Sequence, residues 1–317
     1  MILPRIFGKN RDVLGINERN VGHIYLENPR KLLKLVDDKL TTKDLLKSVN
    51  IPFPEVYGIF RAVHEIKNLE RVLKRDEFVI KPSNGAGGKG IVVIKGRSDN
   101  GWIMANGGII QRMEIEKHCL EVLEGVYSMD GNPSPVYFES LIKSHPALEK
   151  VAFEGVPDVR IIVYRGVPVM AMVRLPTRQS SGKANLHKGA LGAGIKLSEG
   201  TTVHAICKDR SIDVHPDTGA SLLEVEIPFW NDILVIASKS YEAVGLGYLG
   251  VDIVIDERLG PLVLELNARP GLSIQNANMS GLKRRLEVLE KMDLGKLDFD
   301  ERVALAVEFD STDWETV

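Results

Sequence analysis

The chain has 317 residues, of which 44% are hydrophobic and 26% are charged, so it can bury a substantial core in two or more subdomains. Its formal net charge of −2 argues against nonspecific nucleic-acid binding, which usually requires a basic face. Cys119 and Cys207 form no metal-binding spacing and favour a reducing, cytoplasmic setting. Residues 1–10 contain no apolar run long enough for a signal peptide or membrane span, and residues 1–36 are predicted to be an irregular, polar lead-in.

The first predicted regular element is a helix over residues 38–49. It begins at the pair Asp38 and Lys39, and Asn50 and Pro52 mark its end. Its apolar face consists of Leu40, Leu45, Leu46 and Val49.

A glycine-rich loop at residues 85–90 lies between two strand-like segments, residues 77–82 and 91–94. Its glycine spacing matches the dinucleotide-binding fingerprint, but that fingerprint must open a helix, so a Rossmann site is excluded. Strand, loop and strand instead predict a flap whose backbone N–H groups, together with Lys81, bind a triphosphate. A mobile loop without a ligand is the alternative. The predicted nucleotide-binding glycines are Gly85, Gly87, Gly88 and Gly90.

A hairpin over residues 158–174 carries two arginines. Its predicted turn lies at residues 165–168, and a turn centred near Val167 places Arg160 opposite Arg174. Two adjacent guanidiniums are unfavourable without an anion, whereas a hydrogen bond to a charged group is worth about 1.5–3 kcal/mol. The pattern therefore predicts a phosphate or carboxylate between the arginines, and separate solvation of the two side chains is the alternative.

Residues 228–245 are predicted to form a helix, and residues 297–317 a solvated or partly disordered acidic end. Trp230 of this helix is assigned to the core rather than to ligand stacking. The apolar stripe of the helix consists of Ile233, Leu234, Ile236, Ala237 and Tyr241.

The most informative pattern is a second hairpin, with predicted strands at residues 248–256 and 262–267. A turn centred between Arg258 and Leu259 places Asp252 opposite Glu265. Because side chains alternate along a strand, Glu265 and Asn267 share one face. The residues predicted to point the other way, into a core, are Leu262, Leu264 and Leu266.

The polar face of this hairpin predicts a metal site. Two carboxylates about 4–5 Å apart repel by roughly 3–4 kcal/mol at an effective dielectric of 20, so a positive charge is expected between Asp252 and Glu265. Mg²⁺ prefers oxygen ligands and completes its shell with phosphate and water, and Mn²⁺ is possible in its place. Arg269, in the Ala-Arg-Pro-Gly sequence that follows Asn267, adds a cation beside the acidic face. An exposed hairpin with a solvated acidic face is the alternative.

The order of these motifs resembles the ATP-grasp superfamily over roughly residues 36–290. Within it, the chain is most similar to glutamate ligases that modify peptide or protein C-termini, an α-L-glutamate ligase-like set that is related to sugar-transfer-associated ATP-grasp proteins. The resemblance implies an α+β ATP-grasp fold in which two α+β subdomains clamp ATP. It divides the chain into a shortened N-terminal region at 1–76, a flap subdomain at 77–140, a C-terminal subdomain with the metal site at 141–296, and the acidic tail at 297–317.

The resemblance also implies roles for single residues. Lys39 and Lys81 match lysines that hold ATP phosphates, Glu139 and the backbone after it match the hinge that reads adenine, and Asp158 matches an acidic position near the ribose. Asn185 and His187 fall in a loop that closes over the reaction centre, although a surface-loop histidine is the alternative for His187. The expected catalytic residues are Arg160, Arg174, Asn185, His187 and Arg269. The expected magnesium ligands are Asp252, Glu265 and Asn267.

The activity implied by the resemblance is ADP-forming carboxylate–amine ligation through an acyl phosphate. It would join an amino acid such as L-glutamate to a peptide, protein or small carboxylate acceptor. The small domain that relatives carry before the Asp-Lys pair is largely missing, so an open site for a large acceptor or partner protein is expected. The alternatives are an ATP-dependent phosphotransferase and a non-catalytic ATP-binding scaffold. No nucleic-acid partner and no membrane span are expected.

Overall fold

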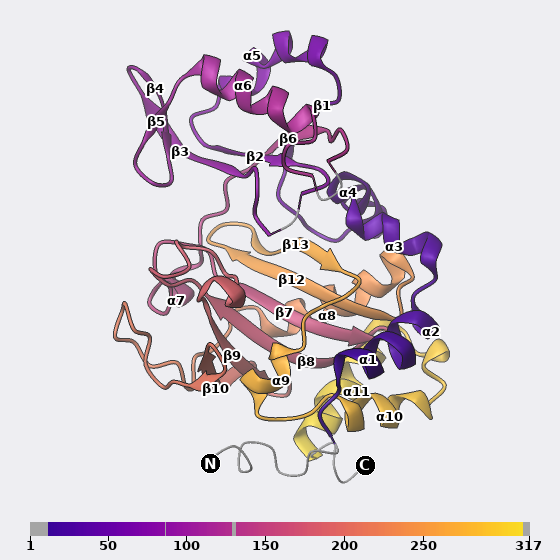
Figure 1. Cartoon of the computed structure of the whole chain (residues 1–317). Helices are drawn as coiled ribbons and strands as arrows, with labels where there is room; N and C mark the ends of the chain where they lie inside the picture. Colours follow the sequence, from indigo (N-terminus) through magenta and orange to yellow (C-terminus); the bar gives the residue numbers. More distant parts are fainter. Residues whose placement is uncertain (1–11, 86, 129–130, 313–317) are drawn as a thin grey trace. The chain divides into compact units, whose positions relative to one another are not determined.

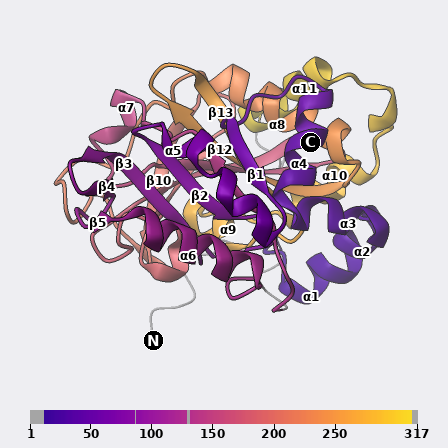
Figure 2. The same cartoon turned by 90° about the horizontal axis from the view of Figure 1, so that it is seen from above.

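Two antiparallel sheets and the helices around them build the chain, which confirms the α+β prediction (Figures 1 and 2). The computed structural model describes residues 12–85, 87–128 and 131–312. No helix within those ranges is both long and apolar enough to cross a bilayer. The chain forms two compact units: unit 1 contains residues 1–37, 41–53 and 143–317, and unit 2 contains residues 38–40 and 54–142. The four-part division implied by the resemblance stays a prediction.

Unit 2 is built on a six-stranded sheet of order β1-β6-β2-β3-β4-β5. Helix α6 begins with a capping box between Gln111 and Glu114 and packs into the core of this sheet. Phe78 and Ile80 face that core, so strand alternation directs Lys81 to the opposite face. The elements are β1 (Val56–Phe60), η2 (Val63–Asn68), α5 (Glu70–Leu73), β2 (Phe78–Pro82), β3 (Val92–Ser98), β4 (Gly101–Met104), β5 (Ile109–Ile110), α6 (Arg112–Leu123) and β6 (Val136–Glu139).

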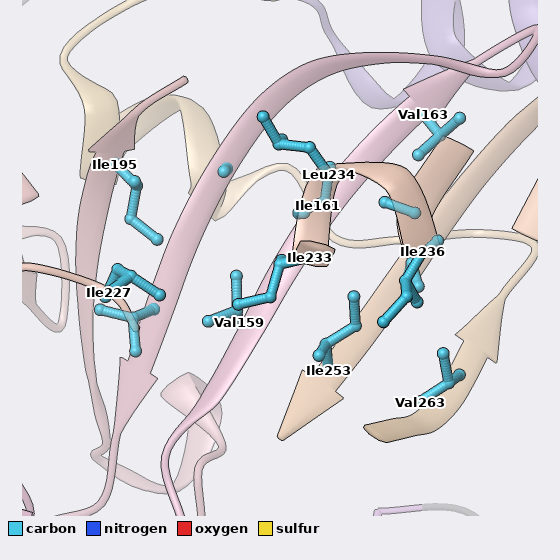
Figure 3. Packing of buried hydrophobic residues seen from close by; sticks show 14 of the residues in the cluster. Val159, Ile161, Val163, Ile195, Ile227, Ile233, Leu234, Ile236, Ile253 and Val263 are labelled. Carbon is cyan, nitrogen blue, oxygen red and sulfur yellow. The ribbon is translucent and has the colours of Figure 1, made fainter. Parts of the chain in front are cut away.

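Unit 1 is built on a seven-stranded sheet of order β11-β10-β9-β8-β7-β12-β13, with apolar cores on both faces. Val159 and Ile161 of β7 pack with Ile233 and Ile236 of helix α8 (Trp230–Val244) in one core (Figure 3), whereas Ile162 belongs to the other. The strands are β7 (Asp158–Tyr164), β8 (Val167–Leu175), β9 (Leu191–Lys196), β10 (Thr201–Cys207), β11 (Arg210–Ser211), β12 (Tyr248–Asp256) and β13 (Gly260–Asn267).

Two predicted helices are confirmed among those of unit 1. The helix expected at 38–49 is α4 (Lys39–Ser48), whose first two residues fall in unit 2, and the helix expected at 228–245 is α8 (Trp230–Val244). Trp230 packs against the core as predicted, and its Nε1 donates to Leu197 O at 2.7 Å. The other helices after residue 140 are α7 (Pro146–Glu149), η3 (Leu186–Lys188), α9 (Ser273–Asn278), α10 (Lys283–Glu290), η4 (Leu294–Lys296) and α11 (Phe299–Thr312).

The hairpin of β12 and β13 has the predicted pairing at Asp252 and a β-bulge immediately after it. Asp252 lies opposite Glu265, as predicted, but the register then shifts and leaves Leu264 without an opposing residue. The bulge moves Val263 onto the core face together with Leu266, while Leu264 is only partly buried. The prediction that the three leucines of this strand share the core face is therefore wrong, because the extra residue breaks the alternation.

Residues 16–27 and 30–37 are helical, which corrects the prediction of an irregular lead-in. The elements are α1 (Ile16–Glu18), the π-helical η1 (Arg19–Ile24), α2 (Tyr25–Glu27) and α3 (Arg30–Asp37). The sequence hides this start because the N-cap residue, Gly15, has no side chain to accept a hydrogen bond, and Gly22 lies inside the helix. Residues 12–28 are named the N-terminal arm below.

Residues 299–312 form α11, which corrects the prediction of a solvated or disordered end over that range. Val303, Ala306 and Phe309 recur every three residues and are buried, so the helix has an apolar stripe that its many acidic residues obscured. Asp310 accepts hydrogen bonds from the N–H and hydroxyl of Ser198 at 3.0 and 3.2 Å. Residues 313–317 of the predicted tail lie outside the described ranges.

Candidate functional site

Four charged side chains of unit 1 form a network on three neighbouring strands. Asp252 on β12 accepts two hydrogen bonds from Arg160 on β7, from Nε to Oδ1 at 2.7 Å and from Nη2 to Oδ2 at 2.6 Å. Nη2 of Arg174 on β8 donates to Asp252 Oδ2 at 2.8 Å, while its Nε donates to Asp158. Asp158 is 4% exposed and Asp252 is 1% exposed. Two buried negative charges are therefore balanced by two largely buried positive charges.

The predicted pairing of the two arginines is wrong, although both contact one anion. The loop between β7 and β8 contains only two residues, both with positive φ, and the register shifts by one residue between Ile162 and Val163, so Arg174 lies opposite Asp158 rather than Arg160. Arg160 lies opposite Asp252 on the neighbouring strand β12. The anion that the arginines share is thus the carboxylate of Asp252, which the protein itself supplies.

The network shifts the pKa values of its two aspartates in opposite directions. Burial alone would raise the pKa of Asp252, but attraction by Arg160 and Arg174 and their hydrogen bonds outweigh burial and lower that pKa to about 2. At Asp158, burial dominates over the attraction of Arg174 and, with the nearby charge of Asp252, raises the pKa to about 6. Asp252 is therefore ionised at neutral pH, whereas Asp158 titrates closer to neutrality.

Glu265 and Asn267 on β13 add oxygen donors beside Asp252. Glu265 lies directly opposite Asp252, and Nδ2 of Asn267 donates to Asp252 Oδ2 at 3.1 Å, so the amide oxygen of Asn267 is directed elsewhere. Asp252 accepts four hydrogen bonds, three at Oδ2 and one at Oδ1, so Oδ1 keeps a lone pair. A cation can therefore bind Asp252 through Oδ1, whereas at Oδ2 it would have to replace a donor.

These residues fit a magnesium ion best through Glu265 and Asn267. Within the described ranges, no three His, Cys, Asp or Glu side chains come together as a metal cluster, so amide and phosphate oxygens would have to complete the shell. The positive charge expected beside Asp252 is supplied in part by the arginines. The assignment of Asp252, Glu265 and Asn267 as magnesium ligands stays a prediction, and Asp252 is its weakest member because its oxygens are engaged.

The remaining predicted catalytic residues of unit 1 lie on loops. Oδ1 of Asn185 accepts from the N–H of His187 at 3.0 Å and caps the short helix η3, which gives Asn185 a structural task. The side chains of His187 and Arg269 are exposed. In the part of the chain that the structure describes, neither forms a hydrogen bond or ion pair with the buried network. Their catalytic roles stay predictions.

Lys39 and the glycine-rich loop come together in unit 2. Nζ of Lys39 donates to Gly85 O at 2.5 Å, and its backbone N–H donates to Ser83 O at 3.2 Å. The fold thus brings a cation from the start of α4 to the first glycine of a loop 46 residues away in the sequence. A phosphate-binding role for Lys39 is consistent with this position and remains untested.

The loop itself is a turn between β2 and β3, and no helix follows it, as predicted for a flap. Gly87, Gly88 and Gly90 have φ values of 63°, 71° and 69°, which glycine adopts without strain. A Cβ atom at Gly87 or Gly88 would meet nothing within 4 Å, whereas one at Gly90 would meet the Tyr127 ring at 2.6 Å. The loop is therefore packed at its end, whereas the space beside Gly87 and Gly88 is open.

Lys81 and Glu139 form an ion pair on the sheet face of unit 2 that lies away from its core. Their strands, β2 and β6, are neighbours, and the side chains are 13% and 1% exposed. The pairing compensates the buried carboxylate of Glu139, which would otherwise be costly. The family resemblance implied separate roles for these residues, towards phosphate and adenine, and their contact was not predicted.

The N-terminal arm holds the loop after Asn267, a feature that the sequence patterns missed. Arg19 is only 8% exposed, and its Nη1 donates to Pro270 O at 2.6 Å. Nδ2 of Asn28 donates to Ala268 O at 3.3 Å. Arginine and asparagine in an apparently polar lead-in carry no local signal for contacts 240 and 251 residues away.

Comparison with known proteins identifies similar ligases. The chain is 26% identical over 249 residues to a probable alpha-L-glutamate ligase of Xanthomonas oryzae pv. oryzae (strain MAFF 311018), covering 78% of this chain and 62% of the relative. A probable alpha-L-glutamate ligase of Aeromonas salmonicida (strain A449) is 24% identical over 235 residues, covering 74% and 57%. The chain thus spans 62% or less of these curated relatives. Among solved structures, the ATP-grasp ligase PsnB complexed with a minimal precursor aligns with a TM-score of 0.45 and 16% identity, covering 83% of this chain and 63% of that chain.

One family model matches most of the sequence. The sequence model described as sugar-transfer associated ATP-grasp matches residues 18–291. This range includes the glycine-rich loop, the charged network and the hairpin with Glu265 and Asn267. The resemblance to ATP-grasp proteins noted in the sequence is confirmed, and the chain belongs to the sugar-transfer associated ATP-grasp family.

Proposed function

We propose that the chain is an ADP-forming ligase that uses ATP and Mg²⁺ to join a carboxylate to an amine. The observation that carries this proposal is the way in which Asp252 and Asp158 hold Arg160 and Arg174. Both arginines are engaged through Nε and Nη2, while Nη1 of each makes no hydrogen bond to a described residue. Two guanidiniums fixed in this way present donors to an anion without reorganisation, as stabilisation of a transferring phosphoryl group requires.

In unit 1, Nη1 of Arg160 and Arg174 would bind the transferring phosphoryl group or the reacting carboxylate. The carboxylate of Glu265 and the amide oxygen of Asn267 would hold Mg²⁺. When bound, the ion supplies positive charge to the phosphate oxygens. Asp252 would act by holding the two guanidiniums, because its oxygens are already engaged.

In unit 2, Lys39 and the N–H groups around Gly87 and Gly88 would bind ATP phosphates. Lys81 would add a second ammonium while it compensates Glu139. The backbone after Glu139, which lies in neither a helix nor a strand, would bind the adenine ring. These roles follow from family membership and from the open, cationic position of the loop.

The proposed reaction has two steps. A carboxylate oxygen of the acceptor attacks the γ-phosphorus of ATP, the bond to ADP breaks, and an acyl phosphate forms. The amine then attacks the acyl carbon, inorganic phosphate leaves, and an amide bond results. L-glutamate is proposed as the amine because the curated relatives are named probable alpha-L-glutamate ligases. The proposed acceptor is a peptide, a protein or a small carboxylate.

Incubation of the protein with ATP, Mg²⁺, L-glutamate and pools of carboxylate acceptors tests this proposal. ADP release and amide formation, both measured by mass spectrometry, are expected together. Replacement Arg174→Met should reduce both, while Arg258→Met, a matched change of an exposed arginine, should not. ADP accompanied by a phosphorylated acceptor would show a phosphotransferase instead.

One observation favours a second candidate, an ATP-binding scaffold without turnover. Arg160, Arg174 and Asn267 together occupy Oδ2 of Asp252 and Arg160 also binds Oδ1, which leaves this aspartate one lone pair, on Oδ1, for a metal. Nucleotide binding without acceptor-dependent ADP release, across carboxylate and amine libraries, would support the scaffold and contradict the ligase.

A further inference from the structure

The outer face of the N-terminal arm carries exposed apolar side chains. Val21, Tyr25 and Leu26 are 64%, 67% and 74% exposed, whereas Arg19 and His23 of the same helical segment are buried. Single exposed apolar residues are common on protein surfaces, but here three fall within residues 21–26, and we call them the apolar patch of the arm.

Helix α3 places three cations beside this patch. Arg30, Lys31 and Lys34 are exposed, and none of them forms an ion pair with any residue in the described ranges. The intervening leucines at 32 and 33 pack against the main core of unit 1, so the orientation of α3 is fixed. Helices α2 and α3 lie side by side in both views (Figures 1 and 2).

The acidic residues near the patch are largely neutralised. Glu18 forms an ion pair with Lys283 at 2.6 Å. Glu27 accepts two hydrogen bonds from the guanidinium of Arg165, at 2.5 and 2.9 Å. Asp37, at the far end of α3, is exposed and adds one negative charge to the rim. Among residues 16–37, the exposed charges outside ion pairs are therefore three cations and the carboxylate of Asp37.

We propose that this arm surface, defined as Val21, Tyr25, Leu26, Arg30, Lys31 and Lys34, docks on a membrane that contains anionic lipids. Apolar side chains next to unpaired cations match such a membrane, because the apolar groups enter the boundary between headgroups and acyl chains while the cations bind lipid phosphates. A tyrosine suits the same boundary, since its ring is apolar and its hydroxyl is polar.

A protein partner fits this surface less well. Stable protein interfaces bury more than about 1,000 Å² in total, and lysine is depleted in them. Three apolar side chains form a small patch by that measure, and lysines are two of the three cations that border it. The chemistry of the surface therefore favours a lipid headgroup layer.

The arm is held firmly enough to dock without rearrangement. Gln275 binds the backbone of Leu14 with both its amide oxygen and its amide nitrogen, at 2.8 and 3.1 Å. Asn28 binds the backbone of Tyr248 in the same way, at 2.8 and 2.9 Å. The inner face of the arm thus keeps the outer side chains in place on unit 1.

Vesicle sedimentation with the full chain tests the proposal. The vesicles consist of phosphatidylcholine alone or with roughly one third phosphatidylglycerol. The cation variant replaces Arg30, Lys31 and Lys34 with glutamine. Its matched control replaces three exposed lysines elsewhere in unit 1, Lys150, Lys208 and Lys291, with glutamine and so makes the same change in net charge. The apolar variant is Tyr25→Ser with Leu26→Ser, and its control is Val203→Ser with Val214→Ser, which are 48% and 49% exposed.

We expect the wild type to sediment with the anionic vesicles and not with phosphatidylcholine alone. Each lost cation should lower the partition coefficient about fivefold, the equivalent of about 1 kcal/mol, so the cation variant should bind about 100-fold more weakly. The apolar variant should bind at least about tenfold more weakly, and both controls should bind like the wild type. Residues 1–11 are present in every protein and cannot cause the differences. Unchanged circular dichroism would show that the exposed substitutions leave the fold intact.

Three results would overturn the proposal. The first is a wild type that binds neither kind of vesicle. The second is an equal loss in the cation variant and its control, which would mean that net charge alone drives adsorption. The third is a concentration-dependent dimer, measured by analytical ultracentrifugation, that the apolar variant abolishes while vesicle binding stays absent. That outcome would assign the surface to a second copy of the chain. None of these readouts requires ligase activity, so the test is independent of the proposed function.

Discussion

Replacing Arg174 with methionine removes the cation that contacts both buried aspartates of the network. Methionine keeps an unbranched side chain, so the change tests charge more than packing. Asp158 and Asp252 are 4% and 1% exposed; Arg160 would still bind Asp252, whereas Asp158 would lose the hydrogen bond from Arg174. Removal of one partner from a buried ion pair typically costs about 3–5 kcal/mol, because the other charge stays buried without compensation. The expected loss here is about 3 kcal/mol at neutral pH, since uptake of a proton by Asp158 relieves part of the repulsion.

A second substitution separates the charge effect from a packing effect. Combining Arg174→Met with Asp158→Asn removes one charge of each sign, so the double variant should be more stable than Arg174→Met alone by about 1–3 kcal/mol. Arg258→Met changes an exposed arginine in the turn between β12 and β13 and should stay within about 0.5 kcal/mol of the wild type.

Urea unfolding, followed by circular dichroism at neutral pH, measures these differences as shifts of the midpoint at constant m-value. The reasoning about the network would be refuted if Arg174→Met were no less stable than Arg258→Met. It would also fail if the double variant were no more stable than the single one, because the loss would then come from packing rather than from unbalanced charge.

Three further predictions follow from the site. The raised pKa of Asp158 means that its protonated form stabilises the fold below about pH 4 and that this contribution is lost as the pH rises through about 6. The stability of Asp158→Asn relative to the wild type should therefore increase by about 2–3 kcal/mol across that window, and parallel urea-unfolding curves against pH would contradict the shift. Glu265→Gln with Asn267→Ala should weaken Mn²⁺ binding in the presence of ATP by about 10- to 100-fold, measured by electron paramagnetic resonance, and unchanged affinity would remove these ligands from the metal site. Arg19→Met should lower the free energy of unfolding by about 1–3 kcal/mol, because it leaves a buried carbonyl without a donor, and a loss no larger than that of the exposed control Arg30→Met would deny the arm this anchoring role.

Local patterns in the sequence were sufficient to predict the hairpins and two of the longer helices. Alternating apolar residues and turn residues act between neighbours in the chain, so they predicted the strands around Asp252 and Glu265 and the pairing of these two residues. The same reasoning predicted the strand, glycine loop and strand of unit 2, and the absence of a helix after the loop excluded a dinucleotide fingerprint. The order of these motifs was enough to indicate the ATP-grasp family.

The register of the strands and the pairing of charged side chains could not be predicted from local sequence patterns. A β-bulge adds one residue to a strand without leaving a distinct signal, and it moved Val263 to the core face that alternation assigns to Leu264. A two-residue turn replaced the longer one expected after β7, and together with a register shift between Ile162 and Val163 it placed Arg174 opposite Asp158. Such shifts of one or two residues change every pair along a hairpin.

The tertiary structure alone decided what neutralises the buried carboxylates. Asp252 meets Arg160 because β12 pairs with β7, and Arg19 reaches Pro270 because the N-terminal arm packs on the far end of the chain. These contacts join residues 92 and 251 positions apart, so no local periodicity encodes them. The sequence by itself determined which segments form strands and that their polar residues cluster, since those properties depend on near neighbours. Which cation lies against which anion depended on strand order, because burial makes an unpaired charge costly and only the packed sheet brings the partners within hydrogen-bond distance.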